Sequence, residues 1–134
     1  MRELLASLAI GVSMILMAAI LWLVFSPPVT AAGCAGITGI ASWYGRESCL
    51  VPSNCRTASG ERFTGNDMTA AMPSLSHLGE RWRVTYKGKS VIVRINDHGP
   101  HKRLGRAIDL SKAAAKKIGI YGPGTGKVCL ERVK

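Results

Sequence analysis

The chain has 134 residues and a formal net charge of +10 at pH 7, from 18 Lys and Arg against 8 Asp and Glu. Behind an apolar N-terminal segment about 100 residues remain, which suffices for one small domain and excludes two. Arg2 and Glu3 cancel and no other charged residue precedes Gly33, so the domain carries the whole charge. A basic domain favours polyanionic partners. Because its basic residues are scattered and form no nucleic-acid-binding motif, we expect anionic cell-envelope polymers and no nucleic acid.

The N-terminal segment has the composition of an export signal. Leu4–Phe25 is uncharged, follows Arg2, and leads into small residues suited to cleavage after Ala31 or Ala32. Residues 4–25 are also long enough to span a bilayer, so a retained membrane anchor is the alternative. We therefore expect residues 1–32 to be a signal peptide or anchor and residues 33–134 to be exported to the periplasm or cell envelope. Lipidation at Cys34 is a third alternative, although Ala31 stands where lipoprotein boxes usually carry Leu.

The domain contains four cysteines: Cys34, Cys49, Cys55 and Cys129. An even set in a small exported domain favours disulfides over a metal site or a nucleophile. A Cys49–Cys55 bridge would close a short, turn-rich loop and leave Cys34 and Cys129 to tie the two ends together. Three pairings are formally open.

In chain order, the residues predict several short strands and one helix. Strand patterns cover Gly36–Tyr44, Arg81–Tyr86, the run that leads to Asp97, and Gly126–Val133. Lys87-Gly88-Lys89 predicts a β-hairpin turn between the second and third of these. Leu110–Gly119 predicts a helix with Ser111 as its N-cap and Gly119 as its end, and residues 49–60 predict a loop. Short strands with a single helix outside the N-terminal segment indicate a mainly β small barrel.

Asp97 is the first candidate functional residue. Val91, Val93 and Ile95 alternate on one strand face, and Gly99-Pro100 ends the strand, so the Asp97 carboxylate is presented at a strand end. The alternative is a turn cap. A second turn delivers Glu61, whose alternative is a solvated turn residue. Two carboxylates in a groove can cleave a glycosidic bond, one as the acid that protonates the leaving oxygen and the other in electrostatic support.

Other side chains are candidates for substrate binding: Trp43, Tyr44, Arg94, His98 and Arg103. The two aromatic rings suit the apolar faces of sugars, whereas the alternating position of Trp82 favours the core. Asp109 is a rival acid, but its place just before the helix favours a structural role. His98 and His101 lack a third ligand, so no metal and no cofactor are expected.

Five blocks of sequence carry a family resemblance: Ala41–Gly45, Thr57–Phe63, Thr69–Ala71, Val93–Pro100, and Arg106–Ser111 with Ala113–Ala115. In order and spacing they resemble the rare lipoprotein A family over residues 36–133. The resemblance implies a six-stranded double-psi β-barrel with one or two short helices, preceded by a hydrophobic N-terminal helix. It also implies endolytic lytic transglycosylase activity on peptidoglycan, which leaves 1,6-anhydro-N-acetylmuramic acid ends. The family acid falls on Asp97 and the second functional carboxylate falls on Glu61.

One departure bears on activity. Where many family members carry a histidine after the Thr-Ala-Ala block, this chain has Met72, which neither exchanges protons nor orients a carboxylate. His77 or His98 would have to substitute for that histidine in space. The alternative function is a non-catalytic, expansin-like barrel that binds wall polysaccharide, or an envelope interaction module.

Overall fold

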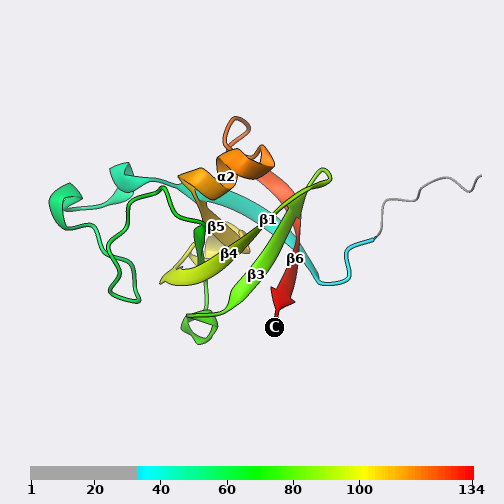
Figure 1. Ribbon diagram of the computed structural model, residues 1–134, viewed down its shortest axis with the longest axis horizontal. Helices are drawn as coiled ribbons and strands as arrows, with labels where there is room; N and C mark the ends of the chain where they lie inside the picture. The colour runs from blue at the N-terminus through cyan, green and yellow to red at the C-terminus, as the bar shows by residue number, and fades with distance from the viewer. Residues whose placement is uncertain (1–32) are drawn as a thin grey trace, which may run out of the picture. The chain divides into compact units, whose positions relative to one another are not determined.

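A computed structural model describes residues 33–134, which fold into a closed barrel of six strands (Figure 1). The strands are β1 (Ile37–Tyr44), β2 (Thr69–Met72), β3 (Arg81–Tyr86), β4 (Lys89–His98), β5 (Ile108–Ser111) and β6 (Thr125–Val133). Their order around the barrel is β1-β5-β2-β4-β3-β6. The β1–β5 and β2–β4 pairs are parallel, and the other pairs are antiparallel. The expected mainly β, six-stranded barrel is therefore confirmed.

The hairpin of β3 and β4 follows the predicted alternation. On β3, Trp82 and Val84 are buried and Arg83 between them is exposed. On β4, Val91, Val93 and Ile95 are buried, whereas Ile92 and Arg94 are exposed. Lys87 and Gly88 connect the strands with φ angles of 46° and 80°, the left-handed values that a tight hairpin turn requires. This register carries β4 along the barrel to Asp97.

Helix α2 (Lys112–Ile118) packs against β4, β5 and β1. The Ser111 side chain accepts a hydrogen bond from the Ala114 amide, and Gly119 ends the helix with a φ of 88°. The helix begins two residues later than the predicted Leu110, because Leu110 and Ser111 still belong to β5 and pair with β1. The caps were therefore predicted correctly, and the first turn was not.

The barrel interior is apolar. Its largest fully buried apolar side chains come from β3, β4, β5, β6, α2 and the segment that follows α2: Val84, Val93, Ile95, Ile108, Leu110, Ile118, Ile120, Val128 and Leu130. Burial of side chains of this size contributes about 1.5–3 kcal/mol each relative to exposure. The core thus fixes the strand ends from which the loops emerge.

Short 3-10 helices interrupt those loops: η1 (Arg46–Ser48), η2 (Pro52–Asn54), η3 (Leu75–His77) and η4 (Lys102–Leu104). The segment after β1, drawn blue-green in Figure 1, extends away from the barrel. It contains the Cys49–Cys55 disulfide, and a second disulfide joins Cys34 to Cys129 on β6. The structure therefore selects one of the three open pairings, and lipidation at Cys34 would compete for a sulfur that this disulfide uses.

The expected N-terminal helix and the signal or anchor segment lie outside the described residues. From residue 33 to residue 134, no helix is long and apolar enough to cross a membrane.

Candidate functional site

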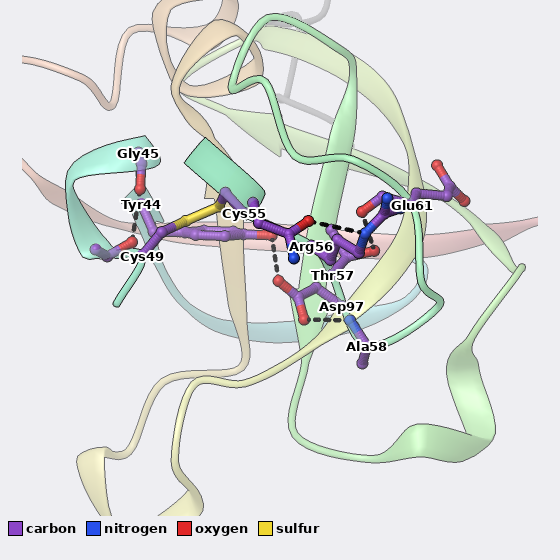
Figure 2. The surroundings of a disulfide bond; sticks show 11 residues. Tyr44, Gly45, Cys49, Cys55, Arg56, Thr57, Ala58, Glu61 and Asp97 are labelled. Atoms are coloured by element: carbon purple, nitrogen blue, oxygen red, sulfur yellow. Dashed lines mark hydrogen bonds between the residues drawn. A yellow bond between two sulfur atoms is a disulfide. The ribbon is translucent and has the colours of Figure 1, made fainter. Parts of the chain in front are cut away.

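Asp97, near the end of β4, accepts three hydrogen bonds through its carboxylate, and Figure 2 shows those from Tyr44 and Ala58. The backbone amides of Ala58 and His98 both donate to Oδ1, each at 2.9 Å. The Tyr44 hydroxyl donates to Oδ2 at 3.0 Å. Two donors occupy Oδ1, so Oδ2 is the oxygen with remaining capacity to exchange a proton with another molecule.

Tyr44 is held rigidly beside Asp97. Its ring stacks on Phe63 with the centroids 4.6 Å apart and the planes 7° from parallel. Burial, and then the negative charge of Asp97, raise the pKa of the Tyr44 hydroxyl far above its usual range, so this hydroxyl stays protonated. Phe63 already covers one face of the ring that the sequence predicted would stack on a sugar. Tyr44 is thus a fixed hydrogen-bond donor to the carboxylate.

Glu61 lies on the turn that also supplies the Ala58 amide. The Ser59 amide donates to the Asn96 carbonyl at 3.0 Å, which docks this turn on the end of β4. The Glu61 carboxylate is held by both terminal nitrogens of Arg94, one of them at 2.7 Å from Oε2. Hydrogen bonding from Arg94 lowers the pKa of Glu61 to about 2. Glu61 is therefore ionised at neutral pH, its charge is paired with that of Arg94, and it is no proton donor.

A cavity of about 360 Å³ opens beside the Asp97 carboxylate. The Tyr44 and Phe63 rings line it together with the disulfide-closed loop, including Leu50, Val51 and Arg56. Neither Glu61 nor Trp43 is among the lining residues. The volume falls within the roughly 300–1,000 Å³ that small-ligand sites usually have. The arrangement therefore places one carboxylate at a cavity large enough for a sugar ring.

The two histidines considered as substitutes at the Met72 position have other partners. His98 Nε2 lies 3.2 Å from the Pro73 carbonyl oxygen, so only the His98 amide contacts Asp97. His77 Nδ1 lies 2.9 Å from Glu80 Oε2. Met72 itself is buried in the core, at the position on β2 that pairs with His98. No imidazole from residues 33–134 forms a hydrogen bond with the Asp97 carboxylate through its ring.

Three further residues were considered from the sequence: Trp43, Arg103 and Asp109. Trp43 packs against the core and against Tyr121, whose ring centroid is 4.7 Å away. Arg103 is exposed on η4. The Asp109 carboxylate accepts a hydrogen bond from Ser42, and burial raises its pKa. Of the predicted set, the structure thus brings Tyr44 and the His98 backbone to Asp97, whereas Glu61 and Arg94 form a separate pair beside it.

Three features of the site were not predicted from the sequence: the Ala58 amide, the Phe63 support and Arg56. The Ala58 amide lies within the Thr57–Phe63 block, so the turn chemistry there was the only signal for it. Among the described residues, no group of three His, Cys, Asp or Glu could hold a metal ion.

Known proteins share the barrel and much of the sequence around this site. A double-psi β-barrel family described as lytic transglycolase matches residues 36–130. The chain belongs to this family. A Synechocystis relative named probable endolytic peptidoglycan transglycosylase RlpA is 50% identical over 98 residues, which cover 72% of this chain and 29% of the relative. The endolytic peptidoglycan transglycosylase RlpA of Neisseria meningitidis serogroup A is 44% identical over 99 residues, which cover 72% of this chain and 38% of the relative.

These matches confirm the resemblance to the rare lipoprotein A family. The chain spans less than two fifths of the length of either relative. Among solved structures, the apo expansin of Clavibacter michiganensis aligns with a TM-score of 0.57 and 19% identity over 72% of this chain and 50% of the expansin. At that identity the likeness shows the fold alone, and it agrees with the barrel described above.

Proposed function

We propose that this lytic transglycolase family member is an exported endolytic peptidoglycan lytic transglycosylase with Asp97 as its acid and base. The observation that carries the proposal is the Asp97 carboxylate, held by Tyr44, Ala58 and His98 at the edge of a cavity of about 360 Å³. The names of the RlpA relatives, which share 44–50% identity with this chain, support the substrate class.

The reaction needs one group that first gives and then takes a proton. Protonated Asp97 donates from Oδ2 to the glycosidic oxygen between N-acetylmuramic acid and N-acetylglucosamine, and the C1–O bond breaks. The C6 hydroxyl of the same muramic residue then bonds to C1, and its proton passes to Asp97. The product ends in 1,6-anhydro-N-acetylmuramic acid and no water is consumed. Asp97 regains its starting protonation.

Tyr44 is the positioning residue in this scheme. Its hydroxyl stays protonated and, held by the Phe63 stack, it donates to Oδ2. When Asp97 loses its proton, this donor and the two amides on Oδ1 stabilise the carboxylate that forms. Glu61 acts indirectly. Its pairing with Arg94 and its contact with Asn96 hold the turn that supplies the Ala58 amide.

The net charge of +10 supports attraction to anionic cell-envelope polymers. Export, and retention through residues 4–25, belong to the same proposal and rest on the sequence of the N-terminal segment. Truncation of residues 1–32 followed by cell fractionation would test both.

A non-catalytic wall-binding barrel is the second candidate. The observation that favours it is the buried Met72 together with the absence, within residues 33–134, of a bond from either nearby histidine ring to Asp97. In that case the cavity would bind glycan without cleaving it.

Mass spectrometry of the products released from purified peptidoglycan separates the two functions. We expect the full chain to release glycans with 1,6-anhydro ends and the Asp97→Asn variant to release none. Sedimentation of the protein with wall sacculi, with no released product from either protein, would support the binding barrel and contradict the transglycosylase.

A further inference from the structure

The loop closed by the Cys49–Cys55 disulfide forms one wall of the cavity beside Asp97. At its tip, Leu50 is fully exposed and Val51 is 56% exposed, although both line that cavity. Two adjacent apolar side chains at the mouth of a cavity are suited to contact with a partly apolar ligand. The apolar tip of this loop is therefore suited to contact a ligand in the cavity.

Arg56 lines the same cavity and is fixed from two sides. Its Nε donates to Asn54 Oδ1 at 3.1 Å, and its Nη1 donates to the Gly60 carbonyl at 2.9 Å. Within the part of the chain that the structure describes, no Asp or Glu forms an ion pair with Arg56. The guanidinium is thus preorganised with its positive charge unpaired, which is the arrangement that binds a carboxylate.

Apart from Arg56 and Asp97, the residues that line the cavity are uncharged. The site thus combines two aromatic rings, an apolar lip, one unpaired cation and the proposed acid. A neutral N-acetylated sugar would use the apolar surfaces but leave Arg56 unpaired. A sugar with an acidic substituent would use both.

We propose that Arg56 is a specificity-determining residue of this cavity, which pairs with the carboxylate of an acidic N-acetylated sugar while Leu50 and Val51 cover the apolar groups. This inference rests on the proposed function, because it assigns a sugar subsite next to Asp97. In peptidoglycan, the lactyl group of N-acetylmuramic acid has that chemistry where no stem peptide is attached, because a stem peptide is joined to the lactyl carboxyl as an amide and removes its charge. The disulfide holds the loop in place, and Arg56 recognises the charge.

Isothermal titration calorimetry on the full chain carrying Asp97→Asn measures binding without cleavage. One probe is a tetrasaccharide of alternating N-acetylglucosamine and N-acetylmuramic acid with free lactyl carboxylates. The other is chitotetraose, which has the same length and no carboxylate. Adding Arg56→Gln is expected to weaken binding of the first probe about tenfold and to change binding of the second by less than about twofold.

Two controls keep the test specific. Arg83→Gln removes the same charge from an ion pair between β3 and β6, where Arg83 contacts Glu131. Neither residue lines the cavity, so both affinities should stay unchanged. Arg56→Lys keeps the charge but loses the fixed fork, so we expect an intermediate loss, with circular dichroism confirming that each variant is folded.

A pair of serine variants tests the loop. Cys49→Ser with Cys55→Ser should weaken binding of both probes, whereas Cys34→Ser with Cys129→Ser, which opens the distant disulfide, should not at a temperature where the protein stays folded.

Equal loss for both probes in Arg56→Gln, or no loss in either, would overturn the assignment of Arg56. If the wild-type chain releases no anhydro product but the Arg56 effect is observed, the proposed activity fails and the subsite stands.

Discussion

The hydroxyl of Tyr44 on β1 donates a 3.0 Å hydrogen bond to Oδ2 of Asp97 on β4. These strands are not neighbours in the barrel, since β5 and β2 lie between them. The bond thus links separate parts of the fold at the carboxylate that we propose as the acid. The Phe63 stack fixes the tyrosine ring, so the hydroxyl has little freedom to leave Asp97.

Tyr44→Phe should therefore slow the reaction without abolishing binding. The phenylalanine ring keeps the stack on Phe63 and removes one hydrogen bond to a charged group, worth about 1.5–3 kcal/mol, so kcat should fall roughly 10- to 100-fold. KM should change little. The rate of anhydro product release at several glycan concentrations gives both parameters. A rise in KM at unchanged kcat would show that Tyr44 contacts substrate instead of positioning Asp97.

Glu61→Gln should make stability at low pH less dependent on pH. Arg94 lowers the pKa of Glu61 from 4.5 to about 2 in the folded protein. A carboxyl with a lowered pKa stabilises the folded state above its unfolded pKa, and this contribution is lost as the pH falls through about 2. Because the Glu61 side chain is 42% exposed, we expect the variant to lose only about 1 kcal/mol or less at pH 7.

Urea unfolding at pH 7, 4.5 and 2.5 measures this contribution. The difference between wild type and Glu61→Gln should shrink as the pH falls. Glu131→Gln is the matched control, since it breaks another exposed ion pair at a longer distance of 3.5 Å. A constant difference between wild type and Glu61→Gln over the whole pH range would mean that the ion pair does not stabilise the fold.

Residue patterns predicted the local parts of this structure well. The alternation of Trp82 and Val84 against Val91 and Val93 reflects one buried strand face, so it located the β3–β4 hairpin. The end signals at Ser111 and Gly119 depend on neighbouring backbone groups, so they located the caps of α2. Each of these signals is contained in a few consecutive residues.

The partners at the site could not be predicted in the same way. Tyr44 and Asp97 are 53 positions apart, and the Glu61–Arg94 pair spans 33 positions, so their contacts depend on the closure of the barrel. Strand β2, with all four residues buried, has no polar and apolar alternation to reveal it. The direction of the His98 ring toward Pro73 is likewise set by the packing of β2 beside β4.

Asp109→Asn should leave product release intact, because the proposed acid is Asp97. Burial raises the pKa of Asp109, and Arg106, with Nη2 at 3.9 Å from Oδ2, partly opposes this shift. A raised folded pKa means that ionisation of Asp109 costs stability as the pH rises above about 4. Asparagine still accepts the Ser42 hydrogen bond but does not titrate.

Thermal unfolding at pH 4 and pH 7 tests the stability effect. The variant should lose less stability than the wild type between these two values. Product assays on the same preparations test the catalytic assignment: loss of 1,6-anhydro products in a folded Asp109→Asn protein would transfer the role of acid from Asp97 to Asp109.

The two disulfides should differ in their contribution to stability. Cys34 and Cys129 are 95 positions apart, whereas Cys49 and Cys55 are 6 apart. In the chain-entropy view, the longer loop restricts the unfolded chain more, so its loss should cost about 4–5 kcal/mol against about 2 kcal/mol for the shorter one. Urea unfolding of the two double serine variants measures both values. The Cys49→Ser, Cys55→Ser protein should keep a cooperative transition but bind glycan less well, because its disulfide orders a cavity wall and does not join strands of the barrel. A larger stability loss from the short loop than from the long one would contradict this division of roles.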